Sequence, residues 1–365
     1  MATKYVTQTK LKKNTIADIF GFILDKGKTA RREIERETGF SWGTVSASVA
    51  FLIEKGYVVE EKTESDGTAG RVTLLLKPAS DGIVSIGLDV NRSGFSCKII
   101  ALDASVKKSI DAEFTAETRD ELLRQSEELC RAALEWCRDE GLRVFSLGIA
   151  IQGSVNGRLG VSMKFPGITE WTPINIKEHF SCTFHLPVYL GHDPKCMLLG
   201  EMSLRRCNDC LLFRVDEGIG MAVSLDGRIL DDTERFELGH TVAVWDDRGG
   251  RCQKQGSLEE YGSLSAIPAV RTKGADAVLS APKAYAAELA RAGEYFARAL
   301  YNMYTLFKPQ RIIITGKASR LECFTESSIS ILKGEDVEVT VDPDNSAAYG
   351  AAVESIKSAI KDFVF

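Results

Sequence analysis

The sequence lacks any apolar stretch long enough to span a membrane, which excludes a protein anchored by transmembrane helices. Residues 1–13 carry charge and lack an apolar core, so we expect no signal peptide. The nine cysteines are odd in number and follow no disulfide framework. We therefore expect reduced thiols and a cytoplasmic protein. The sequence also contains no low-complexity segment.

The composition, with 44% hydrophobic and 27% charged residues, is typical of a soluble chain of two or three domains. The net charge is −5 over the 365 residues, with +3 in residues 1–78 and −8 in the remainder. A mildly basic head on an acidic body suits a head that binds an anionic polymer, although charge alone is weak evidence.

The first 78 residues have the order of elements of a winged helix-turn-helix domain. Apolar residues at helical spacing predict helices over residues 15–24 and 30–37, and Ser41 can cap a third. Two β-rich runs, residues 57–60 and 72–76, flank a polar tip with two glycines. A small helical domain that binds another protein remains the alternative.

Beyond a short linker at residues 78–82, strands and helices alternate, which predicts an α/β body. Asp226-Gly227 between apolar segments predicts a hairpin turn. The expected strands are residues 84–90, 96–101, 145–151, 188–190, 211–215, 221–224 and 311–315. The expected long helices are residues 120–138, 285–306 and 347–360.

Four segments carry a resemblance to a known family: Ser41-Trp-Gly-Thr-Val-Ser46, Gly70-Arg71, Glu237-Leu-Gly-His240 and Gly256-Ser-Leu-Glu259. They resemble the ROK family of bacterial sugar kinases and repressors, in particular its branch of xylose- and N-acetylglucosamine-type repressors, from about residue 15 to 352. The resemblance implies a winged helix-turn-helix domain at residues 1–78, followed by a two-lobed actin-like ATPase (sugar-kinase-like) fold. The lobes would be residues 79–200 and 201–365, with the C-terminal helix packing back on the first lobe.

The resemblance also implies that kinase chemistry has been lost. The family's first phosphate loop, Asp-x-Gly-Gly-Thr, reads Asp89-Val-Asn91-Arg92-Ser93, so both glycines are replaced. The second, Gly-Thr-Gly-Ile-Gly, begins Asp216-Glu217, whose carboxylates would repel a triphosphate by roughly several kcal/mol. The adenosine-side motif is reduced to Thr315-Gly316-Lys317. We therefore expect no enzyme activity.

The polar positions of the family's sugar pocket are retained more fully. Asp193 corresponds to the general base and would be vestigial here, although an aspartate at this point can also cap the helix that follows. The family's Pro-Asn pair reads Pro166-Gly167, and the nearby Trp171 can either stack on a ligand or pack. By correspondence, the residues expected to bind a carbohydrate-like effector are His192, Asp193, Glu237, His240 and Glu259.

We expect no metal and no cofactor. The family's zinc positions read His240, Gly250, Cys252 and Ser257, which leaves two ligands where a structural site needs four. Cys207 and Cys210 form a Cys-x-x-Cys pair that can bind metal, change redox state or be structurally incidental.

These observations together predict a sugar-responsive transcription regulator that acts as a homodimer or homotetramer on duplex DNA. The start of its recognition helix lacks Arg and Lys, so phosphate contacts must come from elsewhere. The alternatives are an active carbohydrate kinase with a DNA-binding head and a constitutive regulator without effector. The expected DNA contacts are Arg31, Arg32, Ser41, Trp42, Thr44, Ser46, Ser48 and Arg71.

Overall fold

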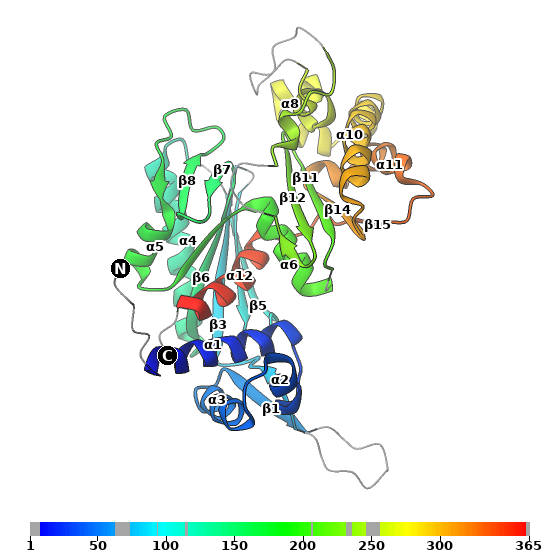
Figure 1. Cartoon of the computed structure of the whole chain (residues 1–365). Coiled ribbons are helices and arrows are strands. Elements are labelled where there is room, and N and C mark those ends of the chain that lie inside the picture. The colour runs from blue at the N-terminus through cyan, green and yellow to red at the C-terminus, as the bar shows by residue number, and fades with distance from the viewer. Residues whose placement is uncertain are drawn as a thin grey trace, which may run out of the picture. The chain divides into compact units, whose positions relative to one another are not determined.

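The computed structural model describes residues 8–62, 74–92, 94–113, 116–205, 207–230, 236–245 and 256–362 (Figure 1). The chain divides into two compact units. The first consists of Met1–Gly153, Leu159–Gly191 and Ala351–Phe365, and the second of Ser154–Arg158 and His192–Gly350. The boundary near residue 192 lies earlier than the sequence predicts, because the helix that starts at Asp193 packs on strands of the second unit.

The first unit begins with three helices and a two-stranded antiparallel sheet. Their bounds are Gln8–Lys26 (α1), Arg31–Thr38 (α2), Trp42–Glu54 (α3), Val58–Lys62 (β1) and Leu74–Pro78 (β2). The helix that was expected over residues 15–24 starts earlier, at Gln8. The polar tip, including Gly70 and Arg71, lies outside the described residues.

Apolar residues at helical spacing hold these helices together, as the pattern predicts. Ile19, Phe20 and Ile23 of α1 are fully buried, as are Ile34 of α2 and the apolar face of α3. Ser41 caps α3 by accepting a hydrogen bond from the backbone N–H of Thr44. Ser48 does not fit its expected role as a DNA contact. Its side chain is only 6% exposed and lies on the buried face of α3, beside Val45, Val49 and Leu52.

Aromatic packing ties these first elements to the α/β part of the same unit. The ring of Tyr57 lies edge-on to Phe145, with centroids 5.6 Å apart, and the Arg143 guanidinium lies over the same ring. The Ala79 N–H donates to the Tyr57 carbonyl, so the predicted linker is short and held in place. Lys357 near the C-terminus forms an ion pair with Asp25 of α1 at 2.7 Å.

The α/β part of the first unit is built on a five-stranded sheet in the order β10-β6-β3-β4-β5. Its strands are Ile83–Asn91 (β3), Gly94–Ala101 (β4), Val106–Ala112 (β5), Arg143–Ile151 (β6) and Val188–His192 (β10). This part of the unit also contains two helices and two short strands outside the five-stranded sheet. They are Arg119–Asp139 (α4), Ile176–Phe184 (α5), Val161–Lys164 (β8) and Ile174–Asn175 (β9). The edge strand β5 escapes prediction because most of its positions are exposed, which removes the apolar alternation.

The second unit is built on a five-stranded mixed sheet in the order β13-β12-β11-β14-β15 (Figure 1). Asp226 and Gly227 form the predicted hairpin turn between β12 and β13, both with positive φ. The strands are Ser154–Asn156 (β7), Cys210–Val215 (β11), Ile219–Leu225 (β12), Arg228–Ile229 (β13), Arg311–Thr315 (β14) and Glu338–Val341 (β15). The helices are Asp193–Arg205 (α6), Leu258–Gly262 (α7), Pro268–Lys273 (α8), Asp276–Leu279 (α9), Ala286–Phe307 (α10) and Glu322–Ile329 (α11). The 3-10 turns in this unit are Leu238–His240 (η1), Leu264–Ala266 (η2), Pro282–Tyr285 (η3), Lys317–Arg320 (η4) and Ser330–Leu332 (η5).

The last helix, Ala347–Asp362 (α12), contributes residues to both units. In the second unit, a Cβ on Gly350 would lie 1.6 Å from the Cys196 carbonyl oxygen, so this position must be glycine for α12 to lie against α6. In the first unit, Gly148 of β6 has the same role toward Ala351. None of the described helices is long and apolar enough to cross a membrane.

Candidate functional site

All five expected ligand-binding positions belong to the second unit. His192 ends β10, Asp193 starts α6, and Glu237 and His240 flank the turn η1. The start of β12 approaches the start of α6, because a Cβ on Gly220 would lie 2.7 Å from Pro194. Both elements are therefore held at the same site.

Glu259 of α7 joins two of these segments. A Cβ on Gly218 would lie 2.9 Å from Glu259 Oε2, and one on Gly239 would lie 3.2 Å from the same oxygen. Glycine at both positions therefore leaves room for the carboxylate. Within η1, His240 Nδ1 lies 3.7 Å from Glu237 Oε2, and both side chains are more than two-fifths exposed. Exposed polar groups of this kind can exchange hydrogen bonds with a polyhydroxylated ligand.

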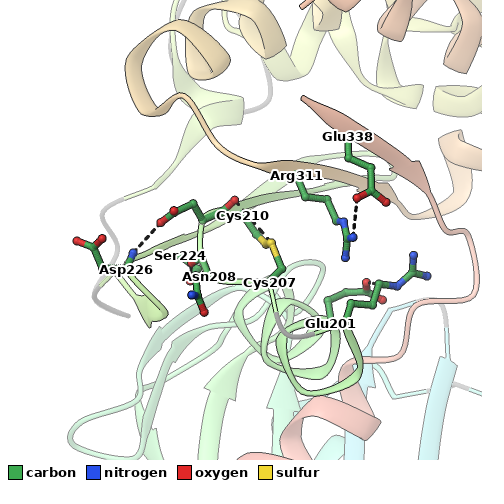
Figure 2. The surroundings of a disulfide bond; sticks show 10 residues. Glu201, Cys207, Asn208, Cys210, Ser224, Asp226, Arg311 and Glu338 are labelled. Carbon is green, nitrogen blue, oxygen red and sulfur yellow. Dashed lines mark hydrogen bonds and ion pairs between the residues drawn. A yellow bond between two sulfur atoms is a disulfide. The ribbon is translucent and has the colours of Figure 1, made fainter. Parts of the chain in front are cut away.

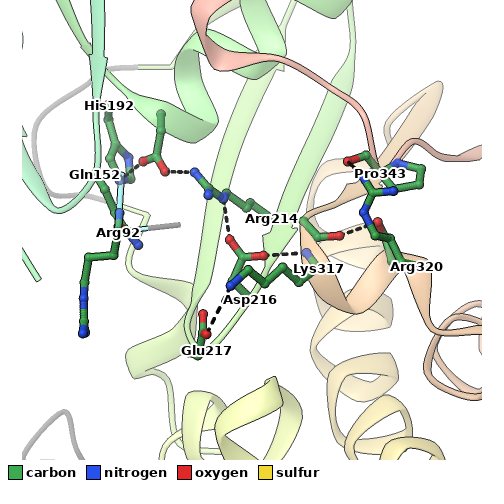
Figure 3. A network of polar contacts seen from close by, with 12 residues as sticks. Arg92, Gln152, His192, Arg214, Asp216, Glu217, Lys317, Arg320 and Pro343 are labelled. Carbon is green, nitrogen blue, oxygen red and sulfur yellow. Dashed lines mark hydrogen bonds and ion pairs between the residues drawn. The ribbon is translucent and has the colours of Figure 1, made fainter. Parts of the chain in front are cut away.

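Asp193 is the most buried of the expected ligand residues, at 2% exposure. Its Oδ2 accepts a hydrogen bond from Nη1 of Arg214, a residue that we did not predict. Arg214 also donates from Nε to Asp216 Oδ2 at 2.7 Å (Figure 3). His192 Nε2 lies 3.1 Å from the second oxygen of Asp193, Oδ1. Asp193 is therefore the centre of a charged cluster and does more than begin a helix.

The residues expected at the second phosphate loop and the adenosine-side motif are bonded to one another within this unit. Asp216 Oδ1 accepts the Lys317 backbone N–H at 2.5 Å, and Lys317 Nζ lies 3.6 Å from a Glu217 oxygen (Figure 3). The serines of the α7–η2 segment, Ser263 and Ser265, donate to the Glu217 carbonyl. The two acids were expected to repel a triphosphate, and here each of them also has a cationic or N–H partner within the protein.

A signal for Arg214 was present in the sequence. It interrupts the apolar run Leu211-Leu-Phe213 and is followed by Val215, all of which are buried in β11. A guanidinium in such a strand needs carboxylates beside it, because burying an unpaired charge is highly unfavourable. The sequence alone does not show which acids these are.

In the first unit, Arg92 packs over the backbone of Gly167. A Cβ on Gly167 would lie 2.6 Å from both Nε and Cζ of Arg92, so the two replaced family positions depend on each other. The Arg92 N–H donates to the Gln152 side chain at 3.0 Å. Trp171 lies with its ring centroid 5.6 Å from that of Phe165 and donates to the Ser162 carbonyl, which favours a packing role.

The described residues contain no group of three or more His, Cys, Asp or Glu side chains that could hold a metal. Gly250 and Cys252 of the expected zinc positions lie outside these residues, whereas His240 and Ser257 lie within them. Cys207 and Cys210 are joined as a disulfide in the turn before β11, with Cα atoms 6.4 Å apart (Figure 2). The expectation that all cysteines are free thiols is therefore wrong for this pair.

The sequence matches the ROK family over residues 85–359. The chain belongs to the ROK family. It is 26% identical over 260 residues to the xylose repressor of Caldicellulosiruptor bescii, covering 69% of this chain and 64% of that protein. It is 20% identical over 258 residues to the DNA-binding transcriptional dual regulator NagC of Escherichia coli K12, covering 69% and 63%. The matches thus span less than two thirds of these relatives.

Solved ROK structures share the fold. A ROK family transcriptional regulator, a homologue of the E. coli MLC protein, aligns with a TM-score of 0.77 and 19% identity over 96% of this chain and 97% of that one. A ROK family glucokinase from Streptomyces griseus, in complex with glucose and AMPPNP, aligns with a TM-score of 0.62 and 18% identity over 75% and 99%. The regulator aligns over nearly the whole chain, including the helices before the family match.

The cysteines should differ sharply in reactivity. Burial raises the pKa of Cys130 to about 12 and that of Cys137 to about 11, so both thiols stay protonated and unreactive at pH 8. Cys182 is exposed and should react. We expect iodoacetamide to label Cys182 in the native, unreduced protein. Cys207 and Cys210 are buried, so we expect them to be labelled in the unfolded protein, and only after reduction. Peptide mass spectrometry measures this, and labelling of the pair without reductant would contradict the disulfide.

Proposed function

We propose that this chain is a DNA-binding transcription regulator. Its effector binds at a sugar site where no phosphoryl transfer takes place. The observation that carries the proposal is the ion pair between Arg214 and Asp193, because one oxygen of the carboxylate that a ROK kinase would use as general base is bound to a guanidinium. The names of the relatives, a xylose repressor and a transcriptional regulator, support repression as its role. We infer a homodimer or homotetramer, since helix-turn-helix proteins pair to match two half-sites.

The first three helices and the β1–β2 sheet support a winged helix-turn-helix head. Ser41, Trp42 and Thr44 are exposed at the start of α3, where a recognition helix would read the major groove. Arg32 is exposed and suits a phosphate contact, whereas Arg31 forms an ion pair with Glu60. Ser46, half-buried, stays a proposed contact, as does Arg71.

The role of α3 is tested with Trp42, whose side chain is 48% exposed. We expect Trp42→Ala to lower operator affinity by about tenfold, a loss of about 1–2 kcal/mol. The salt dependence of binding should not change, because no charge is removed. Operators are first identified by sequencing genomic DNA that the protein binds. Their affinity is then measured by fluorescence anisotropy titration. Trp245→Ala is the matched control, since Trp245 is 94% exposed in the second unit. Equal operator affinity of the Trp42→Ala and Trp245→Ala variants would show that α3 is not the recognition helix.

The effector site is the set His192, Asp193, Glu237, His240 and Glu259. We expect one sugar of a panel that begins with D-xylose and N-acetyl-D-glucosamine to bind, and to change operator affinity by roughly 5- to 150-fold, or about 1–3 kcal/mol. Glu237→Ala should abolish sugar binding in calorimetry and leave DNA binding intact. Glu294→Ala, an exposed glutamate on α10, is the control. Sugar binding that leaves operator affinity unchanged would contradict the regulatory mechanism and favour a constitutive regulator.

Phosphoryl transfer separates the proposal from an active kinase. With Asp193 paired to Arg214 and the loop at Asp216 bonded to Lys317, we expect no turnover above about 1 per second, within the usual range of enzymes. A coupled assay with ATP over hexoses, pentoses and amino sugars measures it. Faster turnover on any of these sugars would establish the kinase alternative.

A further inference from the structure

Arg214 is a buried cation with two carboxylate partners. Its side chain is 10% exposed, and those of Asp193 and Asp216 are 3% and 8% exposed. The fork of the guanidinium allows one side chain to bond two acids from different nitrogens, which a lysine ammonium cannot reproduce in the same geometry. Both acids are therefore held in fixed orientations by a single residue of β11.

Asp216 extends this arrangement to a third segment. Its Oδ2 is bonded to Arg214 and its Oδ1 to the backbone N–H of Lys317. Gly316 comes so close that a Cβ there would lie 2.7 Å from Asp216 Oδ1. The chain of contacts thus joins the start of α6, the end of β11 and the turn before η4. By family resemblance, the last two correspond to nucleotide loops.

Asp193 keeps one acceptor for a ligand. Oδ2 is occupied by Arg214, whereas Oδ1 is buried and makes no hydrogen bond among the described residues. His192 Nε2 lies 3.1 Å from Oδ1, in contact but outside hydrogen-bond geometry. A buried carboxylate oxygen without a donor is unfavourable, so a ligand hydroxyl that donated to it would be bound firmly.

We propose that Arg214 is a positioning residue for the effector: it orients Asp193 so that Oδ1 faces a ligand hydroxyl. Asp216 and the Lys317 N–H fix Arg214 in turn, so the second unit holds this orientation without a nucleotide. The inference rests on the proposed function, because it needs an effector at Asp193. Arg214 acts through Asp193 and does not contact the ligand.

A double-mutant cycle tests the action through Asp193. The probe is D-xylose or N-acetyl-D-glucosamine, whichever the wild-type protein binds. Arg214→Met should weaken binding at least about tenfold, and Arg214→Lys less, because it restores the charge without the fork. In an Asp193→Asn background, Arg214→Met should cause no further loss. If the losses of sugar affinity multiply in the double variant, the proposal is overturned. It is also overturned if a nonhydrolysable ATP analogue strengthens sugar binding more than about twofold.

Hydrogen exchange at the Lys317 amide tests the geometry without any ligand. We expect Arg214→Met to speed this exchange at least about tenfold, because Asp216 loses the partner that orients it. Arg228→Met, an exposed arginine of β13, should leave it unchanged. Unchanged exchange in β14 shows that the variant is folded. If Arg214→Met does not fold, the same measurement is made on Arg214→Lys. If the wild-type protein binds neither sugar, effector control fails, and the Lys317 exchange still decides whether Arg214 orders these loops.

Discussion

A guanidinium enclosed between two carboxylates organises the polar end of the second unit. Arg214 lies in a strand whose other residues are fully or nearly fully buried, so its charge is stable there only because Asp193 and Asp216 lie within bonding distance. Removing one partner of such a buried pair costs about 3–5 kcal/mol. That energy constrains where α6 begins, where β11 ends and how the turn at Lys317 is held.

Close backbone contacts at glycine complete the arrangement around this cluster. Gly350 lets α12 lie against the Cys196 carbonyl of α6, the helix that Asp193 begins. Further along α12, the buried hydroxyl of Ser355 donates to the Ala352 carbonyl and is hydrogen-bonded to Ser146 of β6, which is in turn bonded to Ser85 of β3. Lys357 of the same helix reaches Asp25 of α1. One continuous helix therefore contributes residues to both units and, near its C-terminal end, forms an ion pair with the first helix of the chain.

The sequence predicted the elements whose burial is periodic and missed those whose burial is not. The helices from residue 120 and residue 285 were found nearly in full, because one face of each is apolar. The edge strands β5 and β15 were missed, because both faces of an edge are largely exposed. Ser48 was misassigned, since hydroxyl type alone does not tell which face of α3 it occupies. In the site, Asp193 was found by family correspondence, but its partner Arg214 required knowing which acids lie across from β11.

The residues that differ from the family's phosphate loops satisfy one another's charges and hydrogen bonds within the second unit. Asp216 in place of a glycine would leave a buried carboxylate uncompensated, but Arg214 and the Lys317 N–H satisfy it. Glu217 in place of a threonine adds a second acid, and the Lys317 ammonium lies 3.6 Å from it. Restoring glycine at residue 216 alone would strip Arg214 of one partner and free the Lys317 turn. Because these residues are coupled, single reversions would destabilise the unit before they recreated a phosphate loop. This coupling keeps Asp193, Asp216 and the Lys317 turn in one fixed arrangement, which is what the proposed binding role of the second unit requires.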